Sequence, residues 1–328
     1  MQAAIYAPEG LTLTAEERRF FRDANPAGFI LFKRNCAHQQ QLLRLTDSLR
    51  DLNGRDDVPI LIDQEGGRVA RMKPPQWPAF PAAEKFANLY RVAPSSAIEA
   101  ARSNARALGL MLRTAGINVN ALPLLDVRQE GASDIIGDRA LGSEPMQVAA
   151  LGRATLDGMA SAGVLGIIKH MPGHGRALVD SHKELPVVTA SVDELETDLE
   201  PFERLSSAPM GMMAHVVYTA WDPDRPASMS PTVIRDIVRE RIGFDGFLMS
   251  DDIGMEALRG DFASRSEGVV AAGCDVALHC SGNMDEMLAV ASAVPSLAAE
   301  GEARLARAMA GTWVEADDLD FSQEIAKR

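Results

Sequence analysis

The sequence predicts an α/β protein in which the 328 residues form a single (β/α)8 barrel of the TIM type. Short apolar runs alternate with helical patterns along nearly the whole chain, there are eight such runs, and both of their faces are apolar. Runs of this kind are typical of parallel strands covered by helices on both sides. A barrel of roughly 250 residues plus loops fits this length. An open doubly wound sheet is the alternative.

Eight strands are expected, each ending in a short loop before a helix. They cover residues 3–6, 28–32, 58–63, 117–125, 164–170, 210–215, 246–250 and 275–279. We find no internal repeat, low-complexity segment or linker, so residues 1–328 are expected to form one catalytic domain.

The helices between these runs show one apolar stripe each. Leucines recur at helical spacing between residues 42 and 52, and a similar stripe runs from residue 98 to residue 112. Ser230-Pro231 predicts a helix start, with serine as the N-cap and proline at the first helical position, and this helix should run to about Arg241. A last helix is expected at about 298–315, followed by a charged tail.

Composition and charge exclude several classes of function. An apolar content of 46% supports a packed core, and a net charge of -13 argues against nucleic acid as a partner. No run of about 18 apolar residues predicts a membrane span, and the first residues do not resemble a signal peptide. Three cysteines form no disulfide framework. We therefore expect a cytoplasmic protein without membrane contact; nothing fixes the oligomeric state, and a monomer is compatible with it.

The segment 164–182 is the most informative part of the chain. An apolar run leads into Lys169-His170 and then into a loop with two glycines, His174, and Asp180 two residues before His182. Three of the six histidines fall here. A strand end followed by an Asp-His pair on a loop is typical of a proton-transfer site.

Other strand ends carry polar residues that would meet at the carboxyl rim of a barrel. Planar guanidinium and carboxylate groups bind vicinal hydroxyls in pairs, so this rim suits a ligand such as a sugar. The residues are Asp63, Glu65, Arg71, Asp126, Arg139, Lys169, His170, His215, Asp251 and Asp252.

Adjacent residues of a strand point to opposite sides, so only one of Asp251 and Asp252 should face the barrel centre. Asp252 is then expected to cap the following helix, and Asp251 is the candidate nucleophile of a retaining glycosidase. Such an enzyme needs a proton donor as well. Glu65 is conceivable but equally suits a structural salt bridge. His182 oriented by Asp180 is the better candidate, because the carboxylate raises the basicity of the imidazole.

Three alternatives stay open at this point. His170, His174 and His182, with Asp180, could ligate zinc in a hydrolase, although their spacing matches no tight metal motif and Lys169 would repel a dication. Lys169 could instead form a Schiff base. A sugar-binding protein without turnover would use the same polar rim, and His215 could face either the core or the substrate.

Taken together, these residues resemble glycoside hydrolase family 3, and within it the bacterial β-N-acetylglucosaminidases of cell-wall recycling. The matching segments are 62–69, 136–139, 169–175, 180–182 and 250–252, in the family's order along the chain. The Lys-His-x-Pro-Gly-His-Gly stretch followed by Asp-Ser-His is a specific signal, because other branches of the family lack Asp-Ser-His.

The resemblance implies a family 3 N-terminal-type barrel that uses no cofactor and no metal. It makes Asp251 the nucleophile and His182, oriented by Asp180, the acid/base. It implies sugar contacts from Asp63, Arg71, Arg139, Lys169 and His170. The implied substrate is N-acetylglucosamine β-1,4-linked to 1,6-anhydro-N-acetylmuramic acid, with or without its peptide. A β-glucosidase or an N-acetylglucosaminide phosphorylase is the alternative within the family.

The chain departs from the family's usual pattern at three places. Met171 stands where phenylalanine is common, Arg176-Ala177 where the loop often has Asp-Thr, and Ile253-Gly254 where Leu-Ser is usual. None is a candidate catalytic position, so the departures concern the loop conformation and fine specificity.

Overall fold

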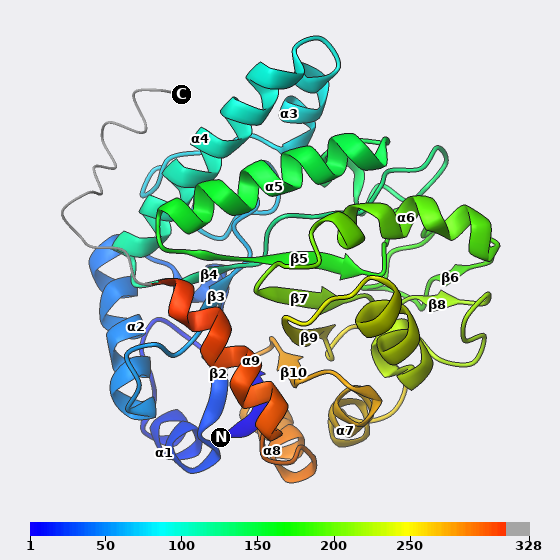
Figure 1. Ribbon diagram of the computed structural model, residues 1–328. Helices are drawn as coiled ribbons and strands as arrows, with labels where there is room; N and C mark the ends of the chain where they lie inside the picture. Colours follow the sequence, from blue (N-terminus) through cyan, green and yellow to red (C-terminus); the bar gives the residue numbers. More distant parts are fainter. Residues whose placement is uncertain (313–328) are drawn as a thin grey trace.

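The structure, a computed structural model that describes residues 1–312, is a closed barrel of eight parallel strands surrounded by helices (Figure 1). The barrel strands are β1 (Gln2–Tyr6), β2 (Pro26–Leu31), β3 (Ile60–Ile62), β4 (Val119–Asn120), β5 (Leu165–Met171), β7 (Met210–Met213), β9 (Phe247–Asp252) and β10 (Val276–His279). Around the barrel they follow the order of the chain, and β10 pairs with β1 to close it. The predicted barrel is confirmed, with a strand that overlaps each of the eight expected ranges.

The surrounding helices are α1 (Ala15–Ala24), α2 (Gln39–Asn53), α3 (Ala83–Tyr90), α4 (Pro94–Thr114), α5 (Pro145–Ser161), α6 (Val192–Arg204), a wide π-type helix (Val233–Arg241), α7 (Phe262–Ala272), α8 (Met284–Ala293) and α9 (Ala299–Met309). The expected start at Ser230 is present, because its Oγ accepts a hydrogen bond of 3.1 Å from the backbone N of Val233. The final predicted helix appears as α9, while its last residues and the tail lie outside the described residues.

Strand β4 is much shorter than the expected 117–125. The chain still follows β5 beyond it, with an isolated bridge between Leu124 and Lys169. Pro123 interrupts the ladder because proline has no N–H to donate. A small sheet that the sequence did not predict, β6 (Val187–Val188) with β8 (Val217–Tyr218), lies outside the barrel.

Two apolar layers hold the barrel together. Inside it, alternate residues of the strands pack in one cluster with residues of α9, for example Leu61, Ile167 and Met249 with Leu305. Figure 1 shows α9 crossing the end of the barrel where the N-terminus lies, opposite the carboxyl ends of the strands. The second cluster lies between the strands and the outer helices. None of the helices in residues 1–312 has the length and apolar character that crossing a membrane requires.

Candidate active site

A cavity of about 230 Å³ opens at the carboxyl ends of the strands, where a barrel of this kind places its active site. Most of the predicted site residues line it: Asp63, Arg71, Arg139, Lys169, His170, His182 and Asp251. Asp180 does not line the cavity but contacts His182 from behind. The structure therefore brings together residues that lie up to 188 positions apart in the sequence.

The two-residue period of the strands decides which side chains point into this cavity. Leu61, Ile167 and Met249 belong to the interior cluster of the barrel. Two residues further along the same strands come Asp63, Lys169 and Asp251, at the level where the apolar interior ends. Along these three segments the lining of the barrel thus changes from apolar to charged within two residues.

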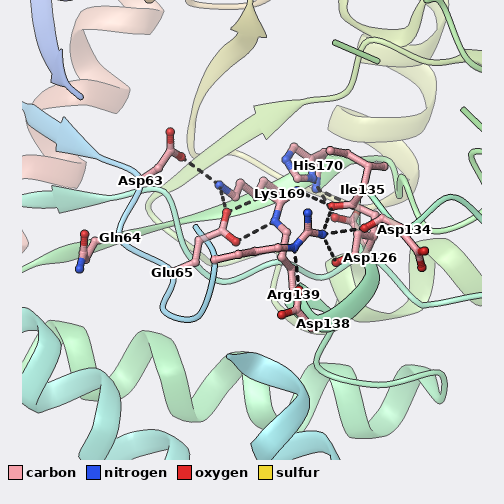
Figure 2. Close-up of polar contacts among 12 residues, drawn as sticks. Asp63, Gln64, Glu65, Asp126, Asp134, Ile135, Asp138, Arg139, Lys169 and His170 are labelled. Carbon is pink, nitrogen blue, oxygen red and sulfur yellow. Dashed lines mark hydrogen bonds and ion pairs between the residues drawn. The ribbon is translucent and has the colours of Figure 1, made fainter. Parts of the chain in front are cut away.

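Lys169 is the centre of an ion network at the cavity floor (Figure 2). Its Nζ lies 2.7 Å from Glu65 Oε1 and 3.2 Å from Asp63 Oδ1, and its side chain is only 2% exposed. Burial alone would lower its pKa, but Glu65 and Asp63 raise the pKa of Lys169 above the ordinary value. Its amine is therefore a fixed cation, which argues against the Schiff-base alternative because that chemistry needs a neutral amine.

Glu65 is held from two sides, which removes it as a proton donor. Arg139 donates two parallel hydrogen bonds to it, from Nε to Oε2 and from Nη2 to Oε1, each 2.8 Å long. Burial works in the opposite direction, yet Lys169 and Arg139 lower the pKa of Glu65 to about 2. Of the two predicted uses of Glu65, the structure thus shows the salt bridge.

Arg68 fixes the loop that carries Arg139. Its Nε lies 2.7 Å from Asp138 Oδ1, and its Nη2 donates to the backbone carbonyls of residues 134, 135 and 136. Sequence reasoning gave Arg68 no role. The glycines before it allow the turn, since a Cβ on Gly66 would lie 2.3 Å from the carbonyl oxygen of Pro81. Arg71, beyond the turn, donates to Asp63 Oδ2 at 3.0 Å.

Asp126 is a second organising carboxylate, fully buried behind the cavity. Its Oδ2 lies 2.8 Å from His170 Nδ1, and its Oδ1 accepts from the backbone N of His170 and of His174 at 3.1 and 2.7 Å. Burial would raise its pKa, but His170 and these hydrogen bonds hold the pKa of Asp126 far below its ordinary value. Its charge fixes Nδ1 of His170 as a donor, so Nε2 of that ring is left for other contacts.

Asp251 lies half-buried at the end of β9 and faces cations and imidazoles. Burial favours its protonated form, but His170, His215, the backbone N of Asp252 and Lys169 lower the pKa of Asp251 below its ordinary value. The backbone N of Asp252 donates to Asp251 Oδ1 at 2.8 Å. Asp251 is therefore ionised at neutral pH, as a carboxylate nucleophile must be.

The expectation for Asp252 was wrong. Asp261, not Asp252, caps α7, because its side chain accepts from the backbone N of Ser264. Asp252 accepts instead from the backbone N of Gly254 at 2.9 Å and lines the cavity together with Asp251. The strand ends at Asp252, so the alternation of side chains no longer directs this residue away. Burial and the neighbouring Asp251 raise the pKa of Asp252 to about 6.

The Asp180–His182 pair forms as expected. Asp180 Oδ1 lies 2.9 Å from His182 Nδ1 and also accepts from the backbone N of His182 at 2.9 Å. The small burial of Asp180 acts the other way, but these bonds lower its pKa below the ordinary value. An ionised carboxylate only accepts, so Nδ1 of His182 donates and Nε2 is left for other contacts. The His182 side chain is 62% exposed and reaches the cavity.

The histidines do not share a metal site. His170 is bonded to Asp126, His174 Nε2 lies 3.3 Å from Ser181 Oγ, and His182 pairs with Asp180. Over residues 1–312, no three His, Cys, Asp or Glu side chains come close enough together to hold a metal ion. His215 is buried, with Nδ1 on Ser228 and Nε2 on the carbonyl of Asp252, so it serves the core.

The cavity also contains an aromatic wall that the sequence did not reveal. The guanidinium groups of Arg34 and Arg71 lie over the Phe32 ring, 5.0 and 5.2 Å from its centroid. Such contacts orient an arginine over a ring face. The only sequence signal was the position of Phe32 at the predicted end of a strand.

Comparison with known proteins matches this architecture. Residues 5–310 match the family described as glycosyl hydrolase family 3 N terminal domain. The chain belongs to this family. A β-hexosaminidase of Methylococcus capsulatus is 38% identical over 325 residues, 96% of this chain and 94% of the relative. A β-hexosaminidase of Aromatoleum aromaticum is 38% identical over 277 residues, 83% of this chain and 77% of the relative.

Among solved structures, NagZ from Neisseria gonorrhoeae in complex with N-trifluoroacetyl-D-glucosamine superimposes with a TM-score of 0.87 and 30% identity, covering 99% of this chain and 96% of that one. The same neighbour has also been solved in complex with a zinc ion, with a TM-score of 0.86. The expected family and the enzyme class, a glycoside hydrolase of the β-hexosaminidase type, are thereby confirmed.

Proposed function

We propose that the protein is a retaining exo-β-N-acetylglucosaminidase that removes terminal β-1,4-linked N-acetylglucosamine from anhydromuropeptides. The observation that carries the proposal is the pairing of an ionised inward-facing Asp251 with a cavity lined by His182. The neighbour that binds an N-acylglucosamine and the β-hexosaminidase relatives support the choice of sugar. We place the substrate and the enzyme in cytoplasmic cell-wall recycling, and the chain as one catalytic domain.

The sugar is bound by the charged floor of the cavity. Asp63 accepts from sugar hydroxyls, while Arg71, Arg139 and Lys169 donate to hydroxyl and carbonyl oxygens, and Nε2 of His170 forms a further polar contact. The ion pairs among these groups hold them in place before the sugar arrives, so little ordering is left for binding to supply. No cofactor takes part in the proposed reaction.

Asp251 and His182 then carry the chemistry. The protonated imidazole of His182 gives its Nε2 proton to the glycosidic oxygen while a carboxylate oxygen of Asp251 attacks C1, and the C1–O bond breaks to release the alcohol. In the second step Nε2 takes a proton from water, whose oxygen attacks C1 and frees Asp251. Two inversions retain the anomeric configuration. The negative charge of Asp180 stabilises the imidazolium of His182 that donates the proton in the first step.

The covalent intermediate is directly testable. A slow 2-deoxy-2-fluoro or 5-fluoro glycoside should label Asp251, which mass spectrometry of peptides identifies. Asp251→Asn is the negative control and should not be labelled. Labelling at Asp252 or Glu65 would contradict the assignment, and a product of inverted configuration by NMR would contradict the retaining mechanism.

The role of His182 is tested by changing the leaving group. A poor leaving group depends on protonation and an activated dinitrophenyl group does not. His182→Ala should therefore abolish most activity on an alkyl glycoside and spare the burst phase with the dinitrophenyl glycoside. Asp180→Asn should act in the same direction by a smaller factor. An equal loss on both substrates would make His182 a binding residue.

The alternatives within the family differ in substrate or acceptor. Chromogenic N-acetylglucosaminide and glucoside, compared with and without phosphate, separate them. We expect hydrolysis of the N-acetylglucosaminide at a rate independent of phosphate. A rate that rises with phosphate, with a sugar 1-phosphate as product, would indicate a phosphorylase. The absence of turnover of both glycosides would indicate a binding protein.

A further inference from the structure

The loop that carries the candidate acid/base has a buried anchor. Ser181, between Asp180 and His182, is 3% exposed, whereas the His182 side chain is 62% exposed. Ser181 Oγ lies 3.3 Å from Nε2 of His174, and the carbonyl of Ser181 accepts from the backbone N of Ala257 at 3.3 Å. The residue at the centre of the Asp-Ser-His segment thus points inward while its neighbour reaches outward.

His174 is held in place by Asp126 and His170. Its backbone N donates to Asp126 Oδ1 at 2.7 Å, and its ring packs edge-on against His170 at 5.7 Å between centroids. Asp126 binds His170, a proposed sugar contact, through its other oxygen. One carboxylate therefore fixes both a sugar-binding ring and the ring on which the loop rests.

His174 is suited to hold a serine hydroxyl rather than to transfer protons. It is buried, and burial together with His170 lowers the pKa of His174 to about 4, so the ring is neutral at neutral pH. Within residues 1–312 its Nδ1 is buried without a hydrogen-bond partner, and Nε2 faces Ser181. A neutral ring accepts from or donates to a hydroxyl equally well.

We propose that His174 is a positioning residue: it docks the Ser181 hydroxyl and so sets where His182 stands relative to the bound sugar. The contacts run from Asp126 through His174 and Ser181 to His182. They hold the acid/base at a fixed position relative to the sugar site. This inference rests on the proposed role of His182. It assigns a function to two cavity-lining residues that the proposed chemistry does not otherwise use.

The contact is tested by a double-mutant cycle read with two leaving groups. The variants are Ser181→Ala, His174→Leu, their combination, and His174→Gln, whose amide reaches the position of Nε2. Ser207→Ala, an exposed serine far from the cavity, is the matched control. Thermal melts establish that each variant is folded before kinetics are measured.

Loss of one hydrogen bond of this kind should lower kcat/KM for an alkyl N-acetylglucosaminide by about three- to tenfold in Ser181→Ala. The burst phase with the dinitrophenyl glycoside should change less than about twofold, because that step needs little protonation. The double variant should be no slower than His174→Leu alone, and His174→Gln should recover much of the loss.

Equal losses on both substrates, or effects that multiply in the double variant, would overturn the inference and leave a packing contact only. If His174→Leu does not fold, the ratio between the two substrates in Ser181→Ala decides alone. If His182→Ala shows no dependence on the leaving group, the proposed function fails instead, whatever Ser181→Ala does.

Discussion

Replacing Glu65 by glutamine tests the charged floor of the cavity. The Glu65 side chain is 4% exposed and carries three short contacts to Lys169 and Arg139. Its pKa falls from 4.5 to about 2 in the folded protein. A pKa difference of this size corresponds to roughly 3 kcal/mol of stability at neutral pH. Glu65→Gln should lower the free energy of unfolding by about that amount, since buried Arg139 loses its carboxylate partner and Lys169 loses one of its two.

The direction in which stability changes with pH follows from the lowered pKa of Glu65. The stabilisation is present above the unfolded pKa and is lost as pH falls toward the folded value of about 2. Urea unfolding between pH 7 and pH 3.5 should therefore show the difference between parent and variant shrinking below about pH 5. Glu267→Gln, on the exposed face of α7, is the control and should show no such trend. A difference below about 1 kcal/mol at pH 7, or one independent of pH, would refute the reasoning.

Two further predictions concern the ionisation of Asp198 and the effect of metal chelation on activity. Burial raises the pKa of Asp198 to about 6, even though Arg176 donates to it at 2.5 Å. The folded state therefore binds this proton more tightly than the unfolded chain does, and the parent should lose stability as the pH rises from about 4 to about 6. Asp198→Asn should remove this part of the pH dependence in urea unfolding, and parallel curves would count against it. Activity should survive exhaustive chelation, with substoichiometric zinc in dialysed protein; loss with EDTA and recovery with zinc would reassign the histidines as ligands.

The sequence predicted the barrel and most of the cavity because both depend on short-range patterns. The change from apolar to polar at a strand end is visible in one window, and it located Asp63, Lys169 and Asp251. The barrel then brings these ends together, so no long-range contact had to be known. The Asp180–His182 bond spans only two residues and was predictable for the same reason.

Partners chosen across the barrel could not be predicted in this way. Arg139 binds Glu65 from 74 residues away, and Asp126 binds His170 from 44. Several other carboxylates at the rim are of the right type to pair with Arg139 or with His170. Only the folded positions of the β3 and β4 loops decide which one is reached. The role of Asp252 was mistaken because the strand rule was applied one residue beyond the point where it holds.

The contrast between local and long-range contacts bears on how the two proposed catalytic groups are tuned. The charge of Asp251 depends on Lys169 and His170 of β5 and on His215, which follows β7, so it is set by the closed barrel. The ring of His182 is hydrogen-bonded to Asp180, two residues away, and stands largely in solvent. A change in the loop can therefore alter the position of the acid/base without changing the ionisation of the nucleophile. Departures such as Arg176-Ala177 fall in that loop, so we expect them to affect the position of His182 more than the ionisation of Asp251.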